Sequence, residues 1–148
     1  DKCDRMGHTS CMTDYLDFTR LERPASPNTY LVAPAGLCQS AEPDTTPPPL
    51  NKSARGLFST LAEIIAAEKR WTRVEADPER LRFKFVAKTP LLGFKDDIDI
   101  MIIPSEEGAP AGEDTASLAI YSRSRVGYSD LGANRKRVQA LLNKLTTK

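Results

Sequence analysis

The fold is decided by the stretch Ser122-Arg123-Ser124-Arg125-Val126-Gly127-Tyr128-Ser129-Asp130-Leu131-Gly132-Ala133-Asn134-Arg135-Lys136-Arg137. It predicts the end of a strand, a turn at Gly127 and the start of a helix. The Ser129 side chain is expected to cap that helix by accepting a hydrogen bond from an amide of the first turn. Apolar residues then recur every three or four positions to about Leu145, as on an amphipathic helix. Asn134 falls on this apolar stripe, so we expect its buried amide to bond the backbone of the preceding turn or an adjacent loop.

Upstream of this stretch, apolar and polar residues alternate as they do in half-buried strands. The clearest case runs from Leu81 to Ala87, and similar patterns cover residues 97–102 and 118–125, while residues 71–76 are expected to form a further short strand. A stripe at helical spacing follows Asn51 or Ser53, either of which suits a helix cap, and it extends to about residue 69. The order helix, four strands, helix predicts an α+β fold with two layers. The simplest packing is an antiparallel four-stranded meander with both helices on one face.

The first fifty residues differ in composition from the rest. They hold seven of the eleven prolines and carry seven acidic against four basic side chains. Proline lacks an amide proton and fixes φ, so this segment predicts an extended arm. We therefore divide the chain into an arm, 1–50, and an α+β domain, 51–148. The arm either wraps its own domain or lies on a protein partner, and its candidate anchors are Tyr15, Phe18, Tyr30 and Leu31.

Global charge and hydropathy exclude several classes of function. The formal net charge of +1 gives no global drive toward nucleic acid or membranes. No apolar run approaches the ~20 residues that cross a bilayer. The sequence shows no phosphate-binding or dinucleotide-binding glycine motif, so no cofactor is predicted. With no histidine in the domain, a serine–histidine–aspartate mechanism is excluded.

All three cysteines lie in the arm: Cys3, Cys11 and Cys38. The chain begins at Asp1 rather than Met, which favours processing during export, and an export compartment permits a disulfide among these cysteines. The odd number leaves one thiol free or paired elsewhere. His8 would complete a set of zinc-ligand types, but the spacing fits no common zinc finger, so no metal site is predicted.

The predicted sheet has one charged face. In a meander, Asp97 and Asp99 stand between Arg82 on one side and Arg123 and Arg125 on the other. The favoured interpretation is a structural ladder of ion pairs. The alternative is a basic groove for an anionic ligand, formed by these three arginines and Ser129. Catalysis by the two aspartates is disfavoured, because neighbouring cations keep both ionised.

The turn from Gly127 to Asp130 leads into a helix N-terminus, which is a natural anion site. Asp130 weakens that possibility because its carboxylate already complements the helix dipole. We expect Arg123 or Arg125 to pair with Asp130 and so to hold the helix on the sheet. The outward basic face of this helix is expected to be solvated and is formed by Arg135, Lys136, Arg137 and Lys144.

The stretch Ser122–Arg135 resembles the hallmark of an uncharacterised family, the domain of unknown function numbered fourteen-ninety-nine. A second similar block is Leu91-Leu92-Gly93-Phe94 with Asp96-Asp97, and a third is Ser26-Pro27-Asn28. The family implies no activity to carry over. Its members resemble proteins of bacterial envelopes and of plastids, and Pro90–Phe94 is slightly more similar to the plastid branch. The resemblance marks Asp96, Asp97, Gly127, Asp130, Asn134 and Arg135 as structural-motif residues, and the ion ladder adds Asp99.

The leading hypothesis is a non-catalytic accessory protein that docks through residues 1–50 in an extracytoplasmic compartment, the thylakoid lumen or the bacterial periplasm. A lumenal subunit of a photosynthetic membrane complex is one form of it. The second hypothesis is a small-molecule module that binds a lipid or an anion. The third is an enzyme of unknown type, which no nucleophile–base pair supports.

Overall fold

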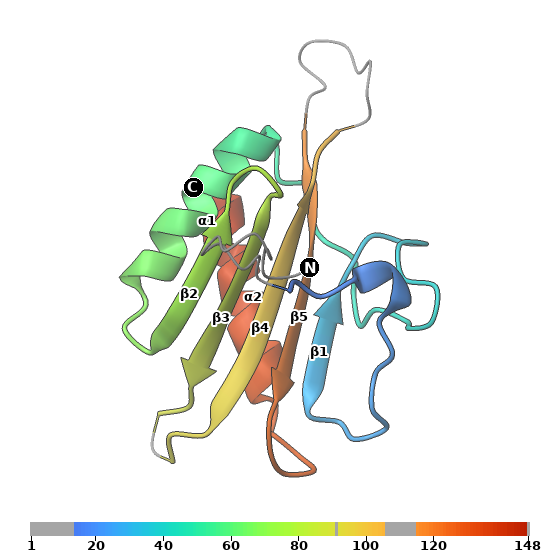
Figure 1. Cartoon of the computed structure of the whole chain (residues 1–148), viewed down its shortest axis with the longest axis vertical. Helices are drawn as coiled ribbons and strands as arrows, with labels where there is room; N and C mark the ends of the chain where they lie inside the picture. Colours follow the sequence, from blue (N-terminus) through green and yellow to red (C-terminus); the bar gives the residue numbers. More distant parts are fainter. Residues whose placement is uncertain (1–13, 91, 106–114, 148) are drawn as a thin grey trace, which may run out of the picture.

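The computed structural model describes residues 14–90, 92–105 and 115–147. The elements are a 3₁₀ turn η1 (Phe18–Arg20), strand β1 (Thr29–Val32), helix α1 (Ala54–Ala67), strands β2 (Trp71–Asp77), β3 (Arg82–Lys88), β4 (Lys95–Ile103) and β5 (Ser117–Ser124), and helix α2 (Ala133–Thr147). The predicted α+β class is confirmed (Figure 1). Ser53 caps α1, since its hydroxyl accepts a hydrogen bond from the Gly56 amide at 3.1 Å.

The sheet is antiparallel and has five strands in the order β1-β5-β4-β3-β2. The expectation of four strands is corrected, because the arm contributes β1, which pairs with β5 in the register Leu31–Tyr121. Residues 29–32 are free of proline, and a short strand at a sheet edge tolerates the prolines on either side. The described part of the arm, residues 14–50, therefore packs as part of the same sheet as the strands that follow residue 50.

Both helices cover one face of the sheet, where they form the main core. The alternation seen in the sequence explains this face, because every second residue of a strand points to the same side. Phe83, Phe85 and Ile100 meet Leu61 from α1 and Val138 from α2 in this core. The rings of Phe58 and Phe83 stack with centroids 4.4 Å apart.

The arm covers part of the opposite face and forms a second, smaller core. Phe18 and Leu31 are buried there against Tyr121 and Ala119 of β5. These two predicted anchors therefore pack within the chain itself, which is the alternative in which the arm wraps its own domain. Tyr15 is half-buried and lies under the Arg80 and Arg82 guanidinium groups, 4.8 and 5.1 Å from its ring centroid. Tyr30 is half-buried and packs on the main core.

Among the described residues, neither helix is both long and apolar enough to span a bilayer.

Candidate functional site

The charged face of the sheet forms the ion ladder that the sequence favoured. The Arg125 guanidinium donates two hydrogen bonds to Asp97, each at 2.9 Å. Arg123 lies 3.2 Å from Asp99, whose side chain is almost fully buried. Asp97 and Asp99 are thus each held by an arginine, Arg123 in the neighbouring strand β5 and Arg125 directly after its end.

Arg82 has a different role from the other two arginines. It is buried, and its guanidinium donates to the backbone oxygens of Ile100 at 3.2 Å and Leu16 at 2.8 Å. Burial lowers the pKa of Arg82, against the opposing charge of Asp99. The arginine therefore fastens the arm to the sheet. The anion groove of Arg82, Arg123 and Arg125 stays a prediction, although all three guanidinium groups already have partners within the chain.

Two aspartates make the stability of the protein depend on acid. Burial would raise the pKa of Asp97, but hydrogen bonding and charge from Arg125 hold that pKa below its ordinary value of 3.8. Burial would also raise the pKa of Asp130, but hydrogen bonds from Asn134 and Gly132 outweigh this effect and lower that pKa. The folded protein thus binds fewer protons than the unfolded chain as acid is added.

We therefore expect the stabilisation from Asp97 and Asp130 to be fully present above their ordinary pKa of 3.8. It should be lost as the pH falls through their lowered pKa values. Urea midpoints measured between about pH 2 and pH 6 check this. Asp97→Asn should reduce the decrease of the urea midpoint in acid, whereas Glu79→Gln, a change at an exposed control position, should leave that decrease unchanged. Equal slopes for Asp97→Asn and the unmodified protein would contradict the assignment.

Helix α2 begins later than predicted and is capped by Asp130 instead of Ser129. The Asp130 carboxylate accepts from the amides of Gly132 at 2.8 Å and Asn134 at 3.1 Å. The Ser129 hydroxyl accepts only a longer bond, 3.3 Å, from the Leu131 amide. The expected pair between Asp130 and Arg123 or Arg125 is wrong, because both arginines bond the aspartates of β4.

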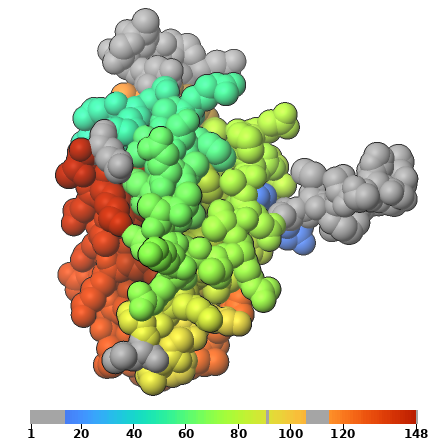
Figure 2. Space-filling model, turned by 90° about the vertical axis from the view of Figure 1, so that its left-hand side faces the viewer, coloured from blue at the N-terminus to red at the C-terminus, as the bar shows by residue number. Residues whose placement is uncertain are grey.

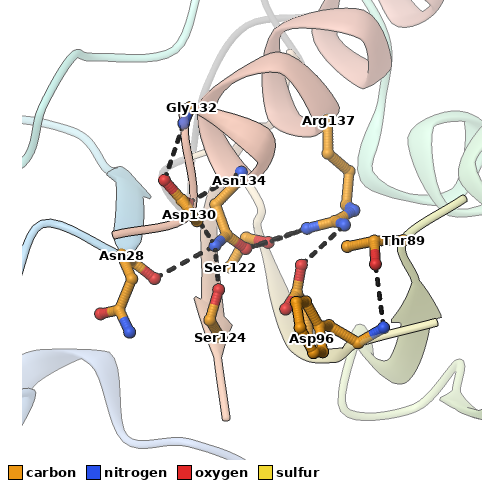
Figure 3. Close-up of polar contacts among 10 residues, drawn as sticks. Asn28, Thr89, Asp96, Ser122, Ser124, Asp130, Gly132, Asn134 and Arg137 are labelled. Carbon is orange, nitrogen blue, oxygen red and sulfur yellow. Dashed lines mark hydrogen bonds and ion pairs between the residues drawn. The ribbon is translucent and has the colours of Figure 1, made fainter. Parts of the chain in front are cut away.

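Asn134 is the centre of a buried polar network between α2, β5 and the arm (Figure 3). Three acceptors lie within hydrogen-bond distance of its amide nitrogen and share its two hydrogens: the Asn28 backbone oxygen at 3.1 Å, the Ser124 hydroxyl at 2.9 Å and the Asp130 carboxylate at 2.6 Å. Its oxygen accepts from the Ser122 hydroxyl and from Arg137. The prediction that Asn134 bonds the backbone of an adjacent segment is confirmed, and that segment is the arm.

The network continues to a buried ion pair. Arg137 lies 2.8 Å from the Oδ2 atom of Asp96, and the Asp96 side chain is only 1% exposed. The same guanidinium donates to Ser122 at 3.1 Å and to Asn134 at 2.9 Å. The Oδ1 atom of Asp96 is buried with no hydrogen-bond partner among the described residues. Arg137 is thus the sole cation paired with Asp96 in the part of the chain that the structure describes.

The arm enters this network through Asn28. Its side-chain amide donates to the backbone oxygen of Gly127 at 2.7 Å, and its own backbone oxygen accepts from the Ser124 amide at 3.1 Å. Gly127 has a φ of 87°, a conformation that favours glycine. The three sequence blocks around Asn28, Asp96 and Asn134 therefore converge at one place in the fold. Arg135 lies exposed on α2, outside this network.

Above the network lies an exposed apolar surface at one end of the molecule. We use the term apolar pole for the side chains carried by the turn between β3 and β4 and by the loop between β5 and α2: Leu92, Phe94, Val126, Tyr128 and Leu131. Leu131 is 88% exposed and Leu92 is 73% exposed. Only one other large apolar side chain of the described residues, Val74 on β2, is exposed. Exposed apolar groups gathered in this way mark interaction sites.

Hollows adjoin the pole. One of about 300 Å³ is lined by apolar atoms of Pro90, Leu92, Phe94 and Leu131. A longer groove of about 770 Å³ runs beside it toward α1, with five cations and two carboxylates in its lining: Arg70, Lys88, Lys136, Arg137, Lys144, Glu68 and Asp130. Figure 2 shows the side where α1 (green), the turn after β3 (yellow) and α2 (orange-red) meet. The site can therefore bind an apolar group next to an anionic one.

Sequence reasoning missed the apolar pole, although a signal was present. Leu92 and Phe94 flank Gly93, and Val126 and Tyr128 flank Gly127, in predicted breaks or turns. Leu131 precedes Gly132 and was predicted to lie on the apolar stripe of the helix, which is wrong because the helix begins at Ala133 and Leu131 is exposed. An apolar residue beside a turn glycine has no strand or helix face on which to be buried, so it is exposed unless another segment covers it. Arg137 was assigned to the outward face of α2, but it points inward to Asp96.

Of the predicted disulfide candidates, Cys3 and Cys11 lie outside the described residues, as does His8. Cys38 is a free thiol, half-buried beside the second core, and burial raises its pKa.

The family model described as "Protein of unknown function (DUF1499)" matches residues 21–145. The chain belongs to this family. The match begins within the arm, so the family unit includes β1 as well as the helices and the other strands. The polar network and the apolar pole both lie within the matched range. No curated protein and no solved structure matches the chain.

Proposed function

We propose that this protein is a non-catalytic docking protein and that the apolar pole, rather than the arm, is its docking surface. One observation carries the proposal: five of the six large exposed apolar side chains of the described residues gather on two neighbouring turns. Both turns belong to sequence blocks that the buried network holds in place. A rigid scaffold that presents apolar loops is a common arrangement for binding.

The compartment and host remain part of the same proposal. An extracytoplasmic location, in a thylakoid lumen or a periplasm, is supported by the family resemblance and by three cysteines within the first 38 residues. A membrane-bound complex, such as a photosynthetic one, is a host that such a protein would serve. The described part of the arm is committed to its own sheet and is the weaker candidate for attachment.

The test compares the pole with another exposed apolar position. Leu92→Ser/Leu131→Ser should weaken sedimentation with membranes of the source cells by at least about tenfold, because two buried leucines contribute several kcal/mol to an interface. Val74→Ser, which changes an exposed residue of β2, should leave it unchanged. Circular dichroism and the urea midpoint confirm that both variants fold. Equal sedimentation of all three proteins would refute docking through the pole.

A second candidate function is a small-molecule module, and the basic groove next to the apolar hollow favours it. Such a module would bind one molecule with an anionic head and an apolar tail. The two functions differ in whether the ligand is a dissolved molecule or an extended surface.

A further inference from the structure

The apolar pole is carried by turns and not by the face of a helix or strand, and its side chains are exposed. Its residues are carried by two turns that close the lower ends of the strand pair β3–β4 and of the connection from β5 to α2 (Figure 1). Gly93, Gly127 and Gly132 hold these turns with φ values of 68°, 87° and 83°. A flat apolar face suits a protein partner, whereas protruding apolar side chains suit insertion between lipid headgroups.

Cations surround the apolar pole. Lys88 and Lys95 flank the turn between β3 and β4, and Lys136 and Arg135 lie in the first turns of α2, all exposed. No ion pair is formed by any of these four side chains within residues 14–90, 92–105 and 115–147. Arg70 adds a further cation to the groove.

The carboxylates at this end are engaged within the chain, and Glu68 of the groove is paired with Lys144. Asp96 is buried and paired with Arg137, Asp97 is bonded to Arg125, and Asp130 caps α2. The charge that faces outward is therefore positive, even though the chain as a whole carries a formal charge of only +1. Apolar turns within a ring of cations are complementary to a bilayer whose headgroups are anionic.

We infer that the apolar pole docks on the surface of a bilayer containing anionic lipids, with Leu92, Phe94 and Leu131 entering the headgroup region and the lysines contacting lipid phosphates. This inference rests on the proposed docking function and names its partner. Neither helix has to cross the bilayer, because the contact is made by turns. The binding combines burial of apolar side chains with electrostatic attraction, so it depends on both lipid charge and salt.

Vesicle flotation with the full chain tests the inference. The protein should float with vesicles of phosphatidylcholine mixed with phosphatidylglycerol, and pure phosphatidylcholine should bind it much more weakly. Added salt should lower the binding. Leu92→Ser/Leu131→Ser should weaken it at least about tenfold. Lys88→Glu and Lys136→Glu, each alone, should weaken it at least about fivefold.

Matched controls separate the pole from general effects. Arg55→Glu reverses one exposed cation in the first turn of α1, which is at the opposite end of that helix from the groove, and it should not change flotation. Val74→Ser should not change it either. Equal losses in Arg55→Glu and Lys88→Glu would overturn the inference, because they would indicate attraction by net charge alone.

Two further outcomes overturn the membrane inference and separate it from the proposed function. If anionic vesicles fail to bind while Leu92→Ser/Leu131→Ser still lowers sedimentation with native membranes, the pole docks on a membrane protein. If the chain binds a monomeric short-chain phosphatidylglycerol below its micelle concentration but not vesicles, it is a small-molecule module instead. If anionic vesicles do not bind the protein and Leu92→Ser/Leu131→Ser leaves sedimentation with native membranes unchanged, the docking function is refuted as well.

Discussion

Arg137→Met should lower the free energy of unfolding by about 3–5 kcal/mol, because it leaves the buried Asp96 carboxylate without its paired cation. Asp96 is almost completely excluded from solvent, and Arg137 is the cation next to it, at 2.8 Å. The substitution also removes donors to Ser122 and Asn134. Urea denaturation monitored by circular dichroism measures the loss. Methionine fills much of the volume of the arginine stem, so the change tests charge more than packing.

Two comparisons make this result specific. Arg135→Met, on the exposed face of the same helix, should change stability by no more than about 0.5 kcal/mol. Asp96→Leu/Arg137→Leu should recover part of the loss, because an apolar pair of similar volume avoids an isolated buried charge. If Arg137→Met and Arg135→Met were equally mild, Asp96 would not depend on Arg137.

Phe18→Ala should cost about 3–5 kcal/mol, the usual range for removing a buried phenylalanine. Phe18 is 1% exposed and packs in the second core with Leu21, Leu31 and Tyr121. Its ring also lies 5.5 Å from the Arg82 guanidinium carbon, so the substitution removes a contact of the residue that fastens the arm. Thermal or urea unfolding measures the effect.

The matched control for Phe18 is a phenylalanine of the pole. Phe94→Ala should cost less than about 1 kcal/mol, because about half of that side chain is already in solvent. A similarly small loss for Phe18→Ala would mean that the arm adds little to the folded domain. That outcome would restore residues 14–50 as a segment free to attach to a partner.

The strands and helices of residues 51–147 were predictable because their signals are local. Alternation of Phe83 and Phe85 with Arg82 and Lys84 identified both the strand and its inward face. The stripe from Val138 to Leu145 did the same for α2. Boundaries were less certain, since Ser129 and Asp130 are both good caps and only the loop geometry selects Asp130.

The candidate site was less predictable because its parts are distant in sequence. Asn134 was recognised as buried, but its partner Asn28 lies 106 residues away. The arginines were recognised as ion-pair donors, but their partners depend on strand register. Arg125 stands close to Asp130 in the sequence, yet the antiparallel pairing of β4 with β5 places it on Asp97.

By itself the sequence determined the α+β class, the inward faces of three strands and two helices, and the presence of an ion ladder. Local periodicity carries this information, because the side chain's direction follows directly from the backbone conformation. Tertiary structure alone decided that the arm supplies a fifth strand, that Arg137 turns inward to Asp96, and that two turns form the apolar pole. These outcomes depend on which distant segments bury each other's polar and apolar groups. Local periodicity does not determine those contacts, because their free energy depends on how the whole chain packs.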